Sequence, residues 1–422
     1  MLLLGVALKK RTPQSNSISA EQDSLAELSE LARSAGAVVA GSHLQARQAL
    51  DPATLVGKGK LEELKIEARL HRATLIIVDH NLTPVQLRNM EEIVDCRVVD
   101  RTQVILDIFA RHARTREGQL QVELAQLNYM LPRLTGGSSE LSRLGGGIGT
   151  RGPGEQKLET DRRRIRSRVA KIKSAIDTVR RQRTTRRQAR RAIPLETVAL
   201  VGYTNAGKST LFNALTNAAV LTSSKMFATL DPTIRAVRLP SQKKILLSDT
   251  VGFIRDLPPG LIAAFRATLE EVQEASLILH VTDVSNPRHL EFDEDVLKVL
   301  HELEVQDRPR LRVYNKIDCI SEEQKETYLA AMQSGNGHGE PRAFVSARTG
   351  EGLAELLKQI DAVLPRDRLI GVSLRLPISD GRLLAMVHAR GRVLKSQATS
   401  RYIAVEAELP TELIEELKEY VM

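Results

Sequence analysis

Short apolar runs alternate with longer stretches of helical periodicity in the first part of the chain. The apolar runs occupy 37–40, 54–57, 74–79 and 96–100, and the helical stretches occupy 61–70, 84–94 and 103–110. Such an alternation of strands and helices is typical of a small domain built on a parallel sheet. The pattern therefore predicts an N-terminal α/β domain over residues 1–114.

Two helices with apolar seams follow, in a segment spanning 115–192. The first has four leucines at 4-3-4 spacing that end at Leu131, and the second carries apolar residues at helical spacing from Leu158 to Val179. Because each seam is buried best against the other, we expect an antiparallel helical hairpin with its arginines on the outer face. The connection, 135–157, holds eight glycines and is longer than a turn between helices needs, which indicates a function or disorder.

A second alternation of strands and helices runs from Thr197 to about Leu364, before Pro365. It predicts a second α/β domain over residues 193–366. The remaining segment, 367–422, has two strand-like runs and a closing amphipathic helix, which predict a small α+β domain.

The clearest motif of the chain runs from Gly202 to Ser209, where GxxxxGKS joins a buried strand to a helix. In such a P-loop the glycines let backbone N–H groups wrap phosphates, and the helix N-terminus adds its dipole. We expect Lys208 to supply a catalytic point charge and the Ser209 hydroxyl to bind Mg²⁺. An ordinary glycine-rich turn is the weaker alternative.

A second motif, DTVG, places Asp249 at the end of the apolar strand KILLS. Ligands of open α/β sheets bind at the carboxyl ends of strands. We therefore expect Asp249 to hold Mg²⁺ through water, and the Gly252 N–H to contact a γ-phosphate.

A third motif, NKID from Asn315 to Asp318, also follows a strand. An aspartate there can accept both N1–H and N2–H₂ of guanine, whereas adenine presents the opposite hydrogen-bonding edge. A polar turn is a plausible alternative for NKID alone, but not for three motifs in this order. Ser346 and Ala347, after the strand RAFV, would add backbone N–H groups near the guanine oxygen.

The threonine that closes on the γ-phosphate is harder to identify, since Thr222, Thr229 and Thr233 all lie between the first two motifs. Its hydroxyl must reach Mg²⁺ from a loop that can release it after hydrolysis. We favour Thr229 as the metal ligand and catalytic residue; local turn bonds are the alternative.

Phe253 occupies the position after Gly252 at which a side chain that orients water is expected. Phenylalanine cannot bond water, so intrinsic turnover should be slow unless another group substitutes. Packing of the loop explains Phe253 equally well. Asn205 could bind K⁺ beside the phosphates, although asparagine is also common in turns; a partner could also complete the site.

The net charge of +9 is concentrated in one segment, 162–191, which holds fourteen Lys and Arg against one acid and leaves −4 for the rest of the chain. Aromatic residues are only 3% of the chain and Trp is absent, which argues against base-stacking surfaces. An arginine-rich face suits the phosphates and shape of RNA; a solvated helix is the alternative.

The two cysteines, Cys96 and Cys319, are too few for a disulfide framework, and no apolar run reaches 18 residues. The apolar start, 1–8, is too short for a signal peptide. We expect a soluble, cytoplasmic protein that is not an integral membrane protein.

Together, GYTNAGKST, FATLDPT, DTVGFIRDLP and NKID, preceded by RTQVILDIFARHARTREGQLQVELAQL and GGIGTRGPGE, resemble the HflX family of ribosome-associated GTPases. The resemblance extends from about Ala37 to Pro365. It implies an N-terminal α/β domain, a helical hairpin and a Ras-like P-loop GTPase domain in a monomer. It also implies Mg²⁺ binding by Ser209 and Thr229, and a hydrophobic residue after DxxG, as at Phe253.

The resemblance further implies that the protein binds GTP and GDP, contacts the large (50S) ribosomal subunit and its rRNA but no DNA, and splits or rescues stalled 70S ribosomes. The glycine-rich connection would reach into rRNA. Three alternatives stay open: a GTP-gated RNA-binding assembly factor without splitting activity, a regulatory switch for a protein partner, and an RNA-stimulated ATPase.

These expectations define two groups of residues. Those expected at the nucleotide are Gly202, Tyr203, Thr204, Asn205, Ala206, Gly207, Lys208, Ser209, Thr210, Phe227, Ala228, Thr229, Leu230, Asp231, Asp249, Thr250, Val251, Gly252, Asn315, Lys316, Ile317, Asp318, Ser346 and Ala347. Those expected at RNA are Arg143, Arg151, Arg162, Arg163, Arg164, Arg166, Arg168, Arg180, Arg181, Arg183, Arg186 and Arg187.

Overall fold

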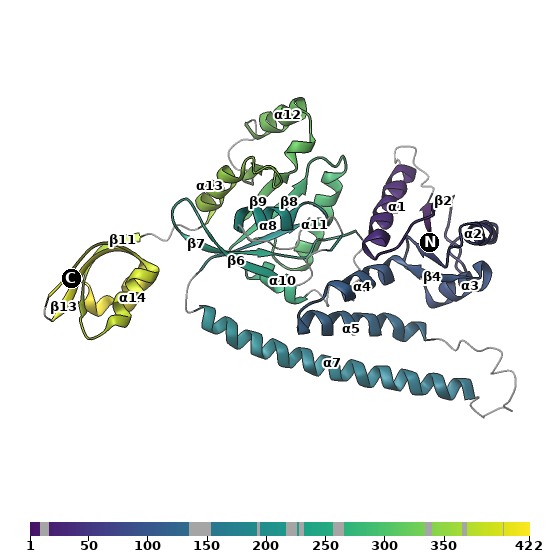
Figure 1. Ribbon diagram of the computed structural model, residues 1–422, viewed down its shortest axis with the longest axis horizontal. Coiled ribbons are helices and arrows are strands. Elements are labelled where there is room, and N and C mark those ends of the chain that lie inside the picture. Colours follow the sequence, from purple (N-terminus) through teal and green to yellow (C-terminus); the bar gives the residue numbers. More distant parts are fainter. Residues whose placement is uncertain are drawn as a thin grey trace. The chain divides into compact units, whose positions relative to one another are not determined.

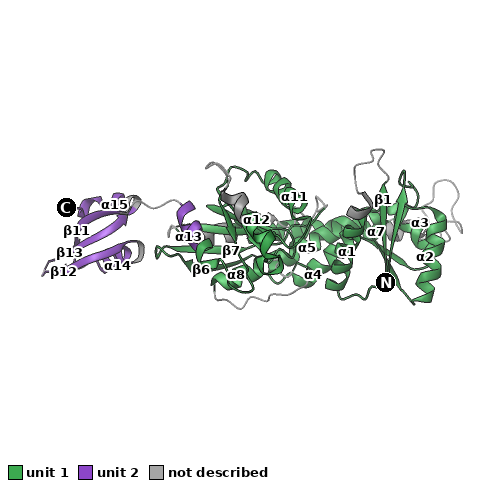
Figure 2. Cartoon of the chain, turned by 90° about the horizontal axis from the view of Figure 1, so that it is seen from above, with its two compact units in different colours: residues 1–356 green, residues 357–422 purple. Residues whose placement is uncertain are grey.

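The computed structural model describes residues 1–8, 17–134, 153–191, 195–216, 226–227, 232–255, 266–333, 340–364, 369–399 and 401–422. The chain divides into two compact units, Met1–Leu356 and Leu357–Met422, which Figure 2 colours separately. Three sheets lie within the described ranges (Figure 1). None of the helices in these ranges combines the length and apolar character needed to cross a bilayer.

The N-terminal sheet has the strand order β2-β1-β3-β4, and all of its strands are parallel. Its elements are β1 (Leu2–Leu8), α1 (Ser17–Ser34), β2 (Gly41–Arg47), α2 (Lys58–Leu70), β3 (Leu75–Val78), α3 (Pro84–Val94), β4 (Arg97–Asp100) and α4 (Arg101–His112). Local chemistry sets two helix starts. Thr83 forms a capping box with Gln86 ahead of Pro84, and the Asp100 carboxylate caps α4 through Gln103 N.

Two predicted strands of this domain are wrong. The strand expected at 37–40 begins only at Gly41, because the register pairs Leu2 of β1 with Gly41 and leaves the preceding residues without a neighbouring strand. The run at 54–57 contributes only an isolated bridge between Asp51 and Leu55. Strand β1 and helix α1 were not predicted, whereas β3 and β4 agree with the predicted runs.

The helical segment contains α5 (Arg116–Met130), the short η1 (Leu131–Arg133) and the long α7 (Pro153–Arg191). Helices α5 and α7 lie side by side (Figure 1). They run antiparallel, as predicted, since Arg162 donates to the Leu134 carbonyl at 2.7 Å while Arg168 pairs with Glu123, which lies earlier on α5.

The central sheet has the order β10-β9-β8-β5-β7-β6, with only β6 antiparallel to its neighbour. Its strands are β5 (Thr197–Gly202), β6 (Thr233–Arg238), β7 (Lys244–Asp249), β8 (Leu277–Asp283), β9 (Arg310–Asn315) and β10 (Arg342–Phe344). Its helices are α8 (Lys208–Thr216), α10 (Arg266–Gln273), α11 (His289–Glu302), η2 (Ile317–Cys319), α12 (Glu322–Gln333) and α13 (Leu353–Val363). The three motifs thus lie at the carboxyl ends of parallel strands of one sheet.

The C-terminal sheet is antiparallel with the order β11-β13-β12. Its elements are β11 (Leu369–Pro377), α14 (Gly381–Arg390), β12 (Arg392–Ala398), β13 (Tyr402–Pro410), α15 (Thr411–Glu416) and η3 (Lys418–Tyr420). Its core includes Leu374, Val405 and Leu417. The α/β fold class is confirmed, while the second compact unit begins within α13, earlier than the predicted boundary at 366/367.

Candidate nucleotide-binding site

The P-loop joins β5 to α8 through positions that require glycine. Gly207 has φ +93°, and a Cβ there would lie 2.2 Å from Asn315 Nδ2. A Cβ on Gly202 would lie 2.2 Å from the Val281 carbonyl oxygen. Asn205 also has a positive φ, 61°, which asparagine tolerates, and its side chain is exposed. The loop backbone therefore packs too tightly against β8 and β9 for larger residues.

Lys208 lies buried at the start of α8. Its Nζ donates to the carbonyl oxygens of Gly202 at 3.0 Å and Tyr203 at 2.7 Å. Burial lowers the pKa of Lys208 to about 8, and the Asp249 carboxylate opposes that shift. The Lys208 ammonium is thus hydrogen-bonded to the backbone of the loop that is expected to bind the phosphates.

Ser209 and Asp249 bring two hard oxygen donors together. Ser209 Oγ donates to Asp249 Oδ2 at 2.7 Å, and Asp249 at the end of β7 is fully buried. A hydroxyl beside a carboxylate is a donor set that suits Mg²⁺ with waters completing the shell. Next to Asp249, Thr250 Oγ1 donates to the Leu200 carbonyl at 2.5 Å, which fixes the DTVG segment against β5.

Asn315 connects the guanine side of the site to the P-loop. It is 1% exposed; its Nδ2 donates to the Ala206 carbonyl at 2.8 Å, and its Oδ1 accepts from Ala347 N at 3.0 Å. Asn315 therefore joins the P-loop, NKID and the segment of Ser346 and Ala347 by hydrogen bonds.

The other two polar positions of NKID are held from different sides. Lys316, in the left-handed region with φ 64°, pairs with Asp283 at 2.6 Å. Asp318 Oδ1 accepts from Ser346 Oγ at 2.7 Å, and this hydroxyl lowers the pKa of Asp318. Asp318 therefore stays an ionised acceptor, the form that pairs with guanine.

Phe253 is a core side chain, 2% exposed, in one cluster with Ile254, Met226 and Phe227. Its backbone pairs with the P-loop, since Thr204 N donates to Phe253 O at 2.7 Å and Phe253 N donates to Gly202 O at 3.1 Å. Packing thus accounts for a phenylalanine at this position.

The segment expected to close on the γ-phosphate is described only in part. Thr222, Ala228, Thr229, Leu230 and Asp231 lie outside the described residues. Phe227 belongs to one core cluster with Tyr203 and Phe253, and its ring meets that of Phe109 in α4 edge-on, with the centroids 4.6 Å apart. Thr233 opens β6 opposite Asp249. Thr210 follows the P-loop in α8, Val251 lies within DTVG and Ile317 lies within NKID.

The arginines of α7 fall into three groups. Arg163, Arg164 and Arg166 are exposed. Arg162 and Arg168 bond to Leu134 and Glu123 on the neighbouring segment. Arg181 is also exposed. Outside the described set lie the side chains of Arg180, Arg183, Arg186 and Arg187. Arg143 and Arg151, which precede α7, lie entirely outside the described residues.

Sequence reasoning missed a partly buried carboxylate beside the P-loop. Glu27 of α1 accepts from Tyr203 Oη at 2.9 Å and pairs with Arg101 at 3.1 Å. The contact spans 176 positions, and no short motif marks it.

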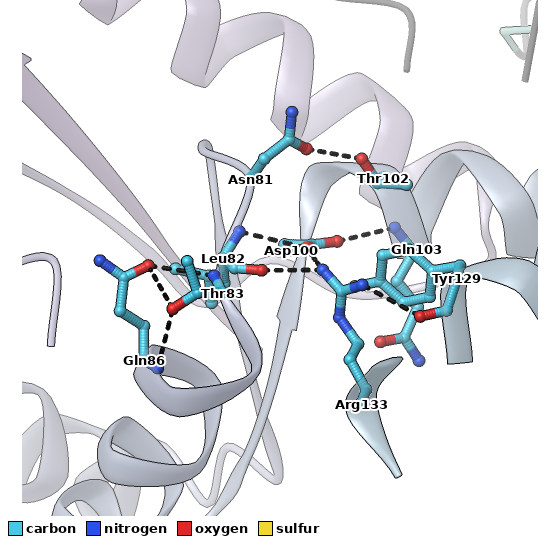
Figure 3. Close-up of polar contacts among 9 residues, drawn as sticks. All are labelled: Asn81, Leu82, Thr83, Gln86, Asp100, Thr102, Gln103, Tyr129 and Arg133. Atoms are coloured by element: carbon cyan, nitrogen blue, oxygen red, sulfur yellow. Dashed lines mark hydrogen bonds and ion pairs between the residues drawn. The ribbon is translucent and has the colours of Figure 1, made fainter. Parts of the chain in front are cut away.

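It also missed a cluster at the carboxyl edge of the N-terminal sheet (Figure 3). Asp100 is fully buried and pairs with Arg133 at 3.1 Å. Arg133 also donates to the carbonyl oxygens of Leu82 at 2.8 Å and Tyr129 at 3.0 Å, and its guanidinium lies 3.5 Å from the centre of the Tyr129 ring. Arg133 thereby fastens the end of the first hairpin helix to this sheet.

Relatives of known family decide what the chain is. The GTPase HflX of Caldanaerobacter subterraneus subsp. tengcongensis is 46% identical over 402 residues, which cover 95% of this chain and 91% of that protein. This chain belongs to the HflX family. The GTPase HflX of Magnetococcus marinus is 48% identical, covering 91% of this chain and 88% of that protein. That of Escherichia coli K12 is 44% identical, covering 86% and 84%.

Family models match in the HflX order: a GTP-binding GTPase N-terminal region over 22–110, a GTP-binding GTPase middle region over 112–190, and a model described as a 50S ribosome-binding GTPase over 197–316. A solved structure described as a complex of SsGBP and GDP has the same fold, with a TM-score of 0.50 and 23% identity over 86% of this chain and 98% of that one. The family resemblance is confirmed, and the protein is a GTP hydrolase.

Proposed function

We propose that the protein binds the large (50S) ribosomal subunit and its rRNA, and uses GTP to split or rescue stalled 70S ribosomes. The observation that carries this proposal is the exposed arginine face of α7, in a chain whose GTPase domain matches a model described as a 50S ribosome-binding GTPase.

The described part of this face suits a phosphate backbone. Arg163, Arg164 and Arg166 are exposed within about one helical turn, and the helix from Pro153 to Arg191 contains no aromatic residue. Guanidinium groups bind phosphate oxygens in pairs of hydrogen bonds, whereas base reading from a single strand relies on stacking. We expect binding with strong salt dependence and little sequence preference.

The nucleotide would bind with Mg²⁺ at the motifs described above. Ser209 and Thr229 would coordinate the ion directly, and Asp249 through water. Lys208, Thr229 and the Gly252 N–H would contact the phosphates, while Asn315, Lys316 and Asp318, with Ser346 and Ala347, would hold the guanine.

Two groups could compensate for the buried Phe253. The first is the ribosome, which would order the site on binding. The second is K⁺ at the exposed amide of Asn205 beside the P-loop. The two sources differ in a measurable way, because only the first requires the subunit.

GTP turnover with and without purified 50S subunits, in potassium and in sodium buffer, tests this proposal. We expect about a hundredfold stimulation by the subunit, which corresponds to about 2.7 kcal/mol of barrier. Potassium dependence without the subunit would assign the compensation to Asn205 instead. No response to either would remove the mechanism proposed here.

The arginine face is tested by the double substitution Arg163→Gln/Arg166→Gln. It should weaken subunit binding tenfold or more at about 0.15 M salt and reduce the salt slope. Arg69→Gln/Arg88→Gln removes the same charge from exposed sites of the N-terminal domain and is the matched control. Equal effects of the two pairs would refute a specific contact by α7. Stimulation without loss of 70S particles would favour an assembly factor, and indifference to ribosomes a regulatory switch.

A further inference from the structure

The hydroxyl of Tyr203 joins three segments that lie far apart in the sequence. It donates to Glu27 Oε1 of α1 at 2.9 Å and accepts from Arg255 N, three residues after Gly252, at 2.9 Å. The Tyr203 ring stacks on Phe292 of α11 with centroids 4.1 Å apart and an angle of 7°. The ring is therefore fixed, and the hydroxyl has little choice of partner. We call Glu27, Tyr203 and Arg255 the clasp.

The N-terminal domain holds its member of the clasp in place. Arg101, 6% exposed, pairs with Glu27 at 3.1 Å and with Asp79 at 2.8 Å. Burial raises the pKa of Glu27, and burial also raises the pKa of Tyr203, so the tyrosine remains a neutral donor. The Arg101 guanidinium offsets only part of the free-energy cost of burying the Glu27 and Asp79 carboxylates. This set of charges therefore contributes little net stability.

The clasp fixes the backbone after Gly252 against the P-loop. Residues 253 and 255 are bonded to Gly202, Tyr203 and Thr204. A Cβ placed on Gly252 would lie 2.9 Å from Lys208 Nζ and 2.9 Å from Thr204 Cα. A γ-phosphate must contact both the Lys208 ammonium and the Gly252 N–H. The Gly252 backbone thus packs closely on the Lys208 side chain and on Thr204, and entry of a γ-phosphate between these groups would require Gly252 to shift.

From this geometry we propose that Glu27 is a positioning residue for nucleotide discrimination: through Tyr203 it holds the DTVG segment against the P-loop and disfavours GTP relative to GDP. GTP binding then requires the Tyr203–Arg255 bond to break, and the N-terminal domain responds through Glu27. This inference rests on GTP binding at the P-loop and does not require a ribosome.

Three further contacts join α1 and α4 to the GTPase domain near the P-loop. Met226 N donates to Ser34 Oγ at 2.9 Å, Phe227 packs on Phe109, and Arg288 pairs with Asp23 at 3.2 Å. The N-terminal domain therefore touches the chain on both sides of the P-loop, at the approach to Thr229 and after Gly252. Both segments must rearrange when a GTPase exchanges GDP for GTP.

The clasp also has space in which to open. Its three residues line a cavity of about 340 Å³ next to the P-loop residues Asn205 and Ala206. A tyrosine that loses its partners can therefore be solvated from this cavity, which keeps the free-energy difference between the closed and open arrangements small. A single part-buried hydrogen bond can then decide between them.

The test is the affinity for GDP and for a non-hydrolysable GTP analogue, measured by nucleotide fluorescence on the full chain with Mg²⁺. Tyr203→Phe keeps the stacked ring and removes only the hydroxyl. Glu27→Gln removes the charge, and Glu62→Gln, at an exposed position of α2 in the same domain, is the control. We expect Tyr203→Phe and Glu27→Gln to shift the preference towards the GTP analogue by about 5- to 10-fold, and Glu62→Gln to leave it unchanged.

The double variant distinguishes a clasp from two separate effects. If Glu27 acts through Tyr203, Tyr203→Phe/Glu27→Gln shifts the preference no further than either single substitution. Additive shifts, an unchanged ratio, or a ratio that moves towards GDP would each overturn the proposal. A purely structural role would lower the melting temperature without changing the ratio. If Glu27→Gln does not fold, Tyr203→Phe alone decides, because its ring packing is intact.

Discussion

Asn315 Nδ2 donates to the carbonyl oxygen of Ala206 at 2.8 Å, so the strand end expected to recognise guanine is bonded directly to the P-loop. The same amide accepts from Ala347 N at 3.0 Å. One buried side chain therefore connects three of the predicted motifs: the P-loop, NKID and the segment of Ser346 and Ala347.

Asn315→Ala should weaken the binding of GDP and of GTP analogues alike, by tenfold or more, because both loops lose their common support. Its loss of two buried hydrogen bonds should also cost about 1–3 kcal/mol in the free energy of unfolding. Nucleotide fluorescence and urea unfolding measure the two effects. Asn89→Ala, which removes one exposed amide bond to Ala53, is the control. Unchanged nucleotide affinity would contradict the supporting role.

Asp318→Asn should shift preference from guanosine to xanthosine nucleotides. The carboxylate accepts two hydrogen bonds from guanine N–H groups, and an amide in its place can donate to the xanthine oxygen instead. Competition between GTP and xanthosine triphosphate in a turnover assay measures the shift. A variant that still prefers GTP would show that Asp318 does not read the base.

Lys208→Met should abolish nucleotide binding yet stabilise the nucleotide-free protein, because it removes a buried charge whose pKa is lowered to about 8. Lowering the pKa from 10.5 to about 8 costs about 3 kcal/mol of stability when the folded protein is charged, at about 1.4 kcal/mol for each unit of pKa. Losing the two hydrogen bonds of the ammonium offsets part of this gain, so we expect a net gain on the order of 2 kcal/mol. The carbonyls of Gly202 and Tyr203 keep backbone donors in Phe253 and Ala206. Thermal unfolding at pH 7 measures the difference.

The pH dependence of that difference has a definite sign. Between about pH 8 and pH 10.5 the unfolded chain keeps a proton on Lys208 that the folded protein has released. The free energy of unfolding of the unsubstituted protein therefore rises with pH in this window, and the advantage of Lys208→Met narrows. A gap that stays constant from pH 7 to pH 10 would contradict the lowered pKa.

Arg133→Lys should loosen the attachment of the helical hairpin to the N-terminal sheet (Figure 3). The arginine bonds Leu82 O, Asp100 Oδ2 and Tyr129 O at once, and an ammonium cannot reproduce that planar set. We expect a loss of about 1–3 kcal/mol, measured by chemical unfolding. The exposed Arg164→Lys is the control, and equal stability of the two variants would contradict the attachment.

Local patterns predicted the parts of this protein whose chemistry is local. The P-loop, DTVG and NKID lie at strand ends because each motif carries its own turn geometry, as the glycine at Gly207 illustrates. Amphipathic periodicity likewise placed α5 and α7 correctly.

Other features depend on pairing across long distances. The start of β2 was misplaced because its position is set by the register with β1, which no pattern at 37–40 contains. The Glu27–Tyr203 hydrogen bond could not be predicted for the same reason, because its partners lie 176 positions apart. An acidic residue on an amphipathic helix is ordinarily solvated. The packing of Phe253 also depends on distant residues, since its buried ring lies in one cluster with Met226 and Phe227.

We propose that GTP and the arginine face together separate the ribosomal subunits. Light scattering from 70S ribosomes, after addition of the protein with GTP or with GDP, tests it most directly. We predict a fall in scattering with GTP, little change with GDP, and a fall at least tenfold slower for Arg163→Gln/Arg166→Gln than for Arg69→Gln/Arg88→Gln. Scattering that stays constant with GTP, while the protein still binds 50S subunits and hydrolyses GTP, would contradict the claim.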